Sequence, residues 1–167
     1  YNSQSLKELK RLGFSGATAS FELKLAQIRD LSKAVPMELI AYGRLPLMIT
    51  ENCIVYNHAG QHVCGDGLRL VDRKGARFPV VKAWGCRNEI LNAKTLFLAD
   101  KSGDYARLGL WGARLVFTTE SPEDCVRILR RYQGQRGWQP GDYTRGLYYR
   151  DVTGEPGKFP FNTVGPD

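Results

Sequence analysis

The chain lacks the features that define several large classes of protein. Its 167 residues contain no apolar run close to the roughly 20 residues that a bilayer-spanning helix needs, and no segment has the pattern of a secretory leader. We therefore expect a cytoplasmic protein with no membrane partner. The first residue is Tyr1 instead of methionine, which suggests a piece of a longer or processed protein.

Cysteine is scarce, and no two cysteines stand close together. The set is Cys53, Cys64, Cys86 and Cys125, which is too sparse for a disulfide scaffold in a chain of this size. The intervals are 11, 22 and 39 positions, whereas structural zinc usually draws on pairs with two to four intervening residues. Three interpretations remain: an iron–sulfur cluster on four thiolates, a catalytic thiol, or buried cysteines without a ligand.

The common hydrolase signatures are also missing. The sequence has neither G-x-S-x-G nor H-E-x-x-H. A peptidase would need another constellation, such as Cys64 with His58 or His62. These two histidines are four positions apart and are candidate ligands or acid–base groups, although exposed loop histidines are the commoner outcome.

Long runs of like charge are absent, so the sequence has no basic tail. The net charge is nevertheless +7, from 24 basic and 17 acidic residues. A basic balance favours a polyanion such as RNA, because each neutralised phosphate releases counterions. Many soluble proteins carry such a charge and bind no nucleic acid, so RNA is a candidate partner on this ground and no more.

The sequence does contain alternating helix and strand patterns. Residues 15–20 predict a short buried strand, residues 21–33 a helix capped by Ser20, and residues 37–43 a second strand. This order predicts a βαβ unit in a parallel sheet. Further on, residues 68–81 predict a hairpin that turns at Asp72–Arg73–Lys74–Gly75.

The last helix is predicted over residues 121–133. Ser121 is its expected N-cap, and Pro122 occupies the first helical position. We expect Val126, Ile128 and Leu129 to face the core.

Together these patterns predict an α/β fold with about three βα steps. We expect a half (β/α)8 barrel over residues 1–134, a hairpin insertion at about 66–84, and an irregular tail or linker to a further domain over residues 135–167. The partner would then be the missing upstream half of the barrel. Because half a barrel exposes sheet edges, a homodimer of the fragment is the alternative.

The cysteines could share one site in such a sheet. Functional residues in βα proteins follow the carboxyl ends of strands. Cys53 follows the strand at 37–43, and Cys125 lies in the first turn of the helix after the strand at 113–119, while the hairpin could return Cys64 and Cys86 to the same end. Four thiols would meet there.

Several segments resemble a known family in their order along the chain. They are "YGRLPLMITENC", "LRLVDRKGARFPVV", "CRNEILNAKTLFLAD" and "YTRGLYYRDV". This series is similar to the collagenase-like peptidase family of unknown catalytic type, catalogued as family U-32. The likeness extends from about Asn2 to Val152.

The resemblance implies the second half of a barrel-like catalytic region. It also implies a nominal protease and, as in several members, a 4Fe–4S cluster that supports hydroxylation of RNA bases or quinone precursors. It assigns the cluster to Cys53, Cys64 and Cys86, with Cys125 as the fourth ligand. An isolated fragment could instead hold zinc or no metal.

Arg44 and Glu51 flank the family-like apolar segment. Arg44 could hold a carboxylate or phosphate, and Glu51 could transfer protons if it were buried; the alternatives are a surface arginine and a capping glutamate. Three functions remain open: a cluster-dependent hydroxylase of RNA bases or a small aromatic, a collagenase-like protease, and a non-catalytic RNA-binding or barrel-completing fragment.

Overall fold

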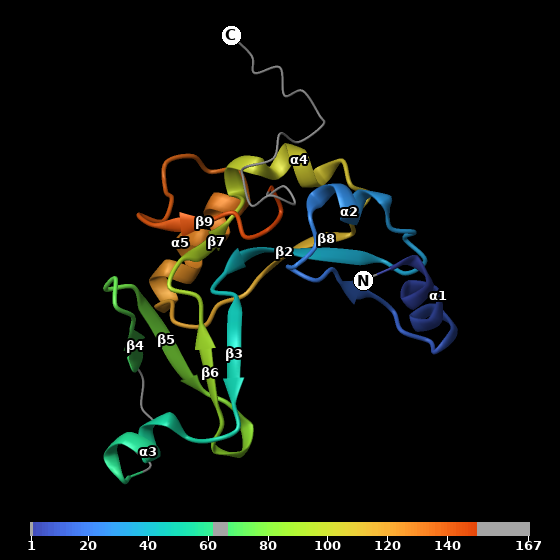
Figure 1. The fold of residues 1–167 in the computed structure, drawn as a ribbon. Coiled ribbons are helices and arrows are strands. Elements are labelled where there is room, and N and C mark those ends of the chain that lie inside the picture. The colour runs from blue at the N-terminus through green and yellow to red at the C-terminus, as the bar shows by residue number, and fades with distance from the viewer. Residues whose placement is uncertain (1, 62–66, 150–167) are drawn as a thin grey trace. The chain divides into compact units, whose positions relative to one another are not determined.

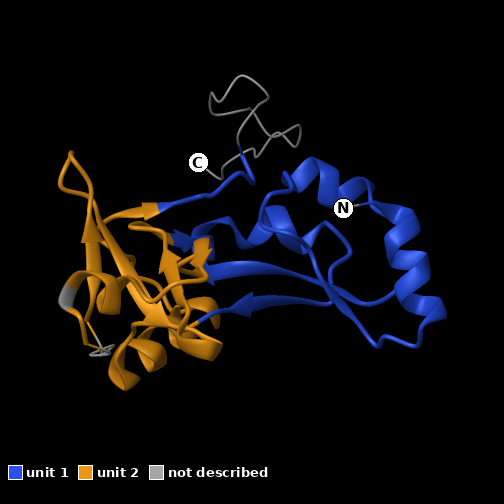
Figure 2. Cartoon of the chain, turned by 60° about the horizontal axis from the view of Figure 1, so that its bottom comes forward, with its two compact units in different colours: residues 1–42, 96–116, 144–167 blue, residues 43–95, 117–143 orange. Residues whose placement is uncertain are grey.

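A computed structural model describes residues 2–61 and 67–149. The fold is mixed α/β, and the described residues form no closed barrel. The chain divides into two compact units, each assembled from separated segments (Figure 2). Within the described ranges, no helix is both long enough and apolar enough to cross a membrane.

The first unit comprises described residues from 2–42, 96–116 and 144–149. Its helices and strands, some of which continue across the unit boundary, are α1 (Ser3–Arg11), β1 (Ala17–Thr18), α2 (Leu25–Asp30), β2 (Met37–Gly43), β7 (Thr95–Phe97), η2 (Ala99–Lys101), α4 (Ser102–Ala106), β8 (Gly112–Leu115) and β9 (Tyr143–Thr144) (Figure 1). The sheet order is β1-β2-β7-β9, with β8 also paired to β2.

The predicted βαβ unit is confirmed. Strands β1 and β2 are parallel neighbours with Ala17 opposite Met37, and α2 connects them. Strand β8 also runs parallel to β2. In a barrel built from consecutive strands β7 would lie between β2 and β8, whereas here β8 pairs directly with β2. This pairing does not establish the expected half-barrel, which stays a prediction.

Alternation along β2 explains the core of this unit. Met37, Leu39 and Ala41 are buried, and the fully buried Leu25 and Ile28 of α2 belong to the same core. Such alternation is expected of a strand with one face against helices.

Helix α2 is shorter than predicted. It begins at Leu25, with Lys24 as the N-cap residue, and the Lys24 amide donates to Gln27 Oε1 at 2.9 Å. Ser20, the expected cap, instead accepts from the amide of Glu22 in the preceding turn. The predicted helix begins too early, because serine is favourable both at a helix N-cap and in a turn.

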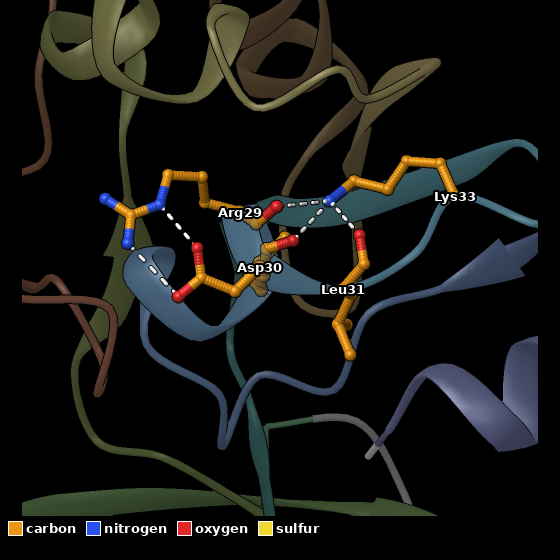
Figure 3. A network of polar contacts seen from close by, with 5 residues as sticks. Arg29, Asp30, Leu31 and Lys33 are labelled. Carbon is orange, nitrogen blue, oxygen red and sulfur yellow. Dashed lines mark hydrogen bonds and ion pairs between the residues drawn. The ribbon is translucent and has the colours of Figure 1, made fainter.

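Lys33 closes the other end of α2 (Figure 3). Its ammonium group donates to the carbonyl oxygens of Ile28, Arg29 and Leu31, at 2.5, 3.0 and 2.9 Å. These oxygens lie at the end of the helix, where the last carbonyls lack their regular helical donor, and the Ile28 carbonyl also accepts from the Leu31 amide at 3.4 Å. A cation at this position also complements the helix dipole.

Residues 144–149, within the segment expected to be irregular, pack into the first unit. Tyr148 is 1% exposed, and its hydroxyl donates to the carbonyl of Ile40 at 2.9 Å. Arg145 donates twice to the carboxylate of Asp100, each time at 2.6 Å, and also to the carbonyl of Phe97. The Tyr149 hydroxyl donates to Asp104 at 2.6 Å. This short segment is therefore an integral part of the unit.

The second unit comprises described residues from 43–95 and 117–143. Its elements are β3 (Pro46–Thr50), α3 (Ile54–Ala59), β4 (Arg69–Val71), β5 (Arg77–Lys82), η1 (Trp84–Cys86), β6 (Asn88–Leu91) and α5 (Pro122–Tyr132). The strands form an antiparallel sheet in the order β3-β6-β5-β4.

The predicted hairpin is confirmed as β4 and β5. The Asp72 carboxylate accepts from the amides of Lys74 and Ala76 at 2.8 and 2.9 Å, and Gly75 adopts a φ of +80°. The turn residues therefore act as predicted. The sequence did not reveal that β6 and β3 extend this hairpin into a four-stranded sheet.

Helix α5 is confirmed with Ser121 as its N-cap and Pro122 in its first turn. The prediction that three of its apolar residues face the core is correct only for Ile128, which is fully buried. Val126 and Leu129 are 47% and 43% exposed.

Candidate functional site

The candidate site lies where β3 ends and β6 begins. Thr50 is opposite Asn88 in the register of these two strands. Cys53 follows Thr50 by three residues, and Cys86 precedes Asn88 by two. Antiparallel pairing in the second unit therefore brings these two chain segments to the same end of one sheet.

This arrangement differs from the one we predicted. We expected Cys53 to leave the carboxyl end of the strand at 37–43, in a parallel sheet. In the structure β3 intervenes between β2 and Cys53, and it pairs antiparallel to β6. Pro46 is the first residue of β3, a position that tolerates proline, and it is opposite Leu91 at the end of β6.

Cys53 is the N-cap residue of α3. It is 7% exposed, and its Sγ accepts from the amide of Tyr56 at 3.4 Å. Asn88 is 1% exposed, and its Oδ1 accepts from the amide of Ile54 at 2.6 Å. This bond from β6 fixes the start of α3 and so fixes the position of Cys53.

Cys86 occupies a turn between β5 and β6 that L-residues rarely adopt. Its φ is +64°, directly after Gly85 at +70°. The amide of Ala83 donates to the carbonyl of Arg87 at 2.9 Å across this turn. A left-handed conformation costs a residue with a Cβ about 1–2 kcal/mol, and glycine or asparagine would tolerate it better. Such outliers persist where the side chain or the geometry serves a function.

The other two cysteines of the expected site are Cys125 and Cys64. Cys125 lies in the first turn of α5, half-buried, with its amide bonded to the Ser121 carbonyl at 2.9 Å. Cys64 and His62 lie outside the described residues. Among those that are described, no three cysteine, histidine or carboxylate side chains cluster closely enough to hold a metal ion.

The thiols of Cys53 and Cys86 are of the type that the expected cluster needs. Two thiols at one end of a sheet are compatible with a 4Fe–4S cluster, which takes four thiolates, and with zinc, which takes four thiolates or a mixture of thiolates and histidines. The described residues supply Cys53 and Cys86 at this end, and the four-cysteine site stays a prediction.

Arg44 contacts the main chain. Its Nη1 donates to the carbonyl of Asn92 at 3.0 Å and to that of Ala93. The guanidinium thereby ties the start of the second unit to the loop between β6 and β7. His58, in the last turn of α3, is exposed.

Glu51 forms an ion pair at the surface. Its Oε2 accepts from Arg87 Nε at 2.9 Å and from Nη2 at 2.8 Å, and 79% of the Glu51 side chain is exposed. The expected proton-transfer role depended on burial, which the structure does not provide. The ion pair instead holds the Arg87 guanidinium beside the turn that carries Cys86.

Trp84, Arg87 and Asn88 were not identified from the sequence. The Arg87 guanidinium lies 5.7 Å from the centroid of the Trp84 ring, and Trp84 is 86% exposed. The one available signal was the segment "AWGCRN", in which a tryptophan stands directly before a glycine in a turn. A large apolar side chain in a tight turn has no core to enter.

A separate depression of about 520 Å³ lies in the first unit. Its lining includes Thr18, Glu38, Trp111 and Arg114. Glu38 accepts from the Thr18 hydroxyl and from Arg114 Nε, both at 2.6 Å. Burial alone would raise the pKa of Glu38, but these two donors and the Arg114 charge lower it. The polar groups of this depression are therefore paired with one another.

Comparison with known proteins identifies no relative of this chain. No family model, curated protein or solved structure matches the chain. Function must therefore be argued from its own residues.

Proposed function

We propose that the chain is part of a cluster-dependent enzyme that hydroxylates an RNA base or a small aromatic compound. Cys53, Cys64, Cys86 and Cys125 would hold a 4Fe–4S cluster. One observation carries the proposal: a buried thiol and a thiol in a strained turn occupy the same end of the β3–β6 pair. The φ of +64° at Cys86 supports the proposal, because glycine would fit this turn better and such outliers cluster at functional sites.

The cluster would supply redox-active iron, and the protein would supply its position. Asn88 fixes the helix that begins after Cys53, through its bond to the amide of Ile54. The Arg87–Glu51 pair fixes the outer side of the Cys86 turn. We further propose that the parallel strands β1, β2 and β8 belong to a barrel completed by an upstream half.

The proposal is tested by metal analysis of the chain purified without oxygen. We expect brown protein with roughly four iron atoms and four inorganic sulfides per chain. Cys53→Ser and Cys86→Ser should lose the iron and the visible absorbance. Tyr56→Phe is the matched control, because it changes a side chain in α3 and leaves the thiol in place.

Other results would redirect the assignment. Colourless protein without iron would contradict the cluster, and stoichiometric zinc would replace it with a zinc site. Cleavage of gelatin that depends on a single cysteine would favour the protease instead. Retention of iron in Cys125→Ser would remove Cys125 from the ligand set.

A further inference from the structure

The hairpin of the second unit carries more basic than acidic side chains. Its strands and turns place five basic side chains in solvent, and none has an ion-pair partner in the described part of the chain: Arg69, Arg73, Lys74, Arg77 and Lys82. Between residues 67 and 91 the carboxylates are Asp72 and Glu89. Asp72 is engaged by two backbone amides of its own turn.

The strand register places these charges along β5. Arg69 is opposite Pro79, and Arg77 is opposite Val71. Because register partners share a face and alternate residues of a strand share a face, Arg69 and Arg77 project from the same side of the sheet. Arg73 and Lys74 occupy the turn at the start of β5. Lys82 ends the strand on the opposite face.

Trp84 stands at the other end of β5. The six residues of this strand span about 20 Å at 3.3 Å per residue. The indole is 86% exposed on a turn closed by the bond between Ala83 and Arg87. Arg87 lies against the ring and is itself held by Glu51. The ring is thus an exposed aromatic surface on a turn closed by a backbone bond, with an arginine beside it.

A line of cations with a fixed exposed aromatic ring matches the chemistry of single-stranded nucleic acid. Phosphates bind cations without regard to sequence, and unpaired bases stack on aromatic rings. An arginine beside the ring adds a cation–π contribution. An acidic protein would satisfy the charges, but it would not explain a lone tryptophan displayed beyond the end of the strand.

We propose that this surface, which we call the basic strip (Arg69, Arg73, Lys74, Arg77 and Trp84), binds single-stranded nucleic acid. The cations contact consecutive phosphates, and one unpaired base stacks on Trp84. The strip ends at the turn that carries Cys86, so a bound base would lie beside the candidate site. The binding does not require a cluster, and it stands or falls independently of the proposed hydroxylation.

Fluorescence anisotropy with a labelled oligonucleotide of about 16 nucleotides tests the proposal, since single-strand sites of this kind cover about 4–16 nucleotides. RNA, DNA and duplex versions are titrated with the full chain, both iron-free and after cluster reconstitution. Trp84→Ala should weaken binding about 5- to 150-fold, as removal of one stacked base does. Trp111→Ala is the matched control, because Trp111 is 76% exposed but lies in the first unit.

The salt dependence tests the cations separately. For single strands, log K falls with log salt by a slope of about 0.7 for each phosphate that the protein neutralises. Arg69→Gln with Arg77→Gln leaves two phosphates without a cation and should therefore reduce the slope by about 1.4. Lys7→Gln with Lys10→Gln removes two charges from α1 and should leave the slope unchanged.

The outcomes separate the alternatives. Tighter binding of RNA than of DNA identifies RNA as the ligand, and equal binding supports single strands in general. Unchanged affinity in Trp84→Ala, an equal loss in Trp111→Ala, or a preference for duplex would overturn the proposal. A surface for an acidic protein would give no anisotropy change with any oligonucleotide, which would also overturn it.

Discussion

The two sheets of this chain use their side chains in opposite ways. In the first unit the charged groups near the sheet are paired, as in Glu38 with Arg114 and Arg145 with Asp100. In the second unit the cations of the basic strip have no ion-pair partner among the residues that the structure describes, and consecutive apolar residues of an edge strand are exposed: Leu47, Met48 and Ile49 are 54%, 57% and 60% exposed. Exposed apolar residues on an edge strand are typical of surfaces that contact other molecules, which fits the binding that we propose for the second unit.

The difference follows from what covers each strand. On β2 alternate residues are buried, and β1, β8 and β7 all pair with it. Within the described ranges β3 pairs with β6 alone, and three residues in a row reach solvent. Substitutions in the first unit should therefore affect stability most, and those in the second should affect binding.

The largest effect is expected from Tyr148→Ala. This tyrosine is 1% exposed, and its hydroxyl bonds to β2 through Ile40. Removing a buried aromatic ring costs about 3–5 kcal/mol. Urea unfolding followed by circular dichroism should show this loss.

The matched control is Tyr56→Ala in the second unit, where the ring is 46% exposed. It should cost about 1 kcal/mol or less, as exposed substitutions generally do. Similar losses for the two tyrosines would contradict the contrast between the units.

The next effect is expected from Arg145→Met. This change removes two charge-assisted bonds to Asp100 and one bond to the Phe97 carbonyl. Hydrogen bonds to charged groups contribute about 1.5–3 kcal/mol, and partial exposure places the expected loss near 2 kcal/mol. If Asp100→Asn costs as much as Arg145→Met, the ion pair itself accounts for the loss.

The same pair predicts acid sensitivity. Burial alone would raise the pKa of Asp100, but the bonds and charge of Arg145 lower it below its usual value. A carboxyl with a lowered folded pKa contributes stability above its unfolded pKa of about 3.9, and this contribution is lost as the pH falls through the folded value. Stability measured from about pH 6 down to about pH 2 should fall less steeply in Asp100→Asn. An identical pH profile in the variant would show that Asp100 contributes nothing.

The sequence predicted local structure well and long-range pairing poorly. Turn chemistry at Asp72 and Gly75 and capping at Ser121 depend on residues close in sequence, and both predictions hold. The pairing of β3 with β6 joins segments about 40 positions apart, such as Thr50 and Asn88, and no local pattern encodes it. Cys53 and Cys86 were selected for their chemistry, but the sheet that brings their chain segments to one end was not foreseen.

The exposed aromatic was missed for a related reason. Apolar periodicity assigns a tryptophan to a core, and only tertiary structure shows that Trp84 has none to enter. The same limit applies to Val126 and Leu129, whose helical spacing predicted burial that the structure does not show.

A smaller effect is expected from Lys33→Met, which keeps the aliphatic part of the side chain and removes the cation. Three carbonyls at the end of α2 would lose the ammonium donor, and the Ile28 carbonyl would keep only its 3.4 Å bond from the Leu31 amide. We expect a loss of about 1–2 kcal/mol in the free energy of unfolding. Lys24→Met at the other end of the same helix is the control. An equal loss there would mean that the carbonyl contacts are not the cause.

The smallest expected effect is a gain in the free energy of unfolding, and it tests whether the Cys86 turn in the second unit is strained. Cys86→Gly removes the Cβ that makes a φ of +64° unfavourable, while glycine adds entropy to the unfolded chain. The net effect should raise the free energy of unfolding of the metal-free protein by about 0.5–1 kcal/mol. Cys86→Ala removes the thiol but keeps the Cβ, so it should give no such gain. Both variants should lose iron if Cys86 is a ligand. Equal stability of the glycine and alanine variants would show that the turn is unstrained, and the strongest structural argument for a functional Cys86 would fail.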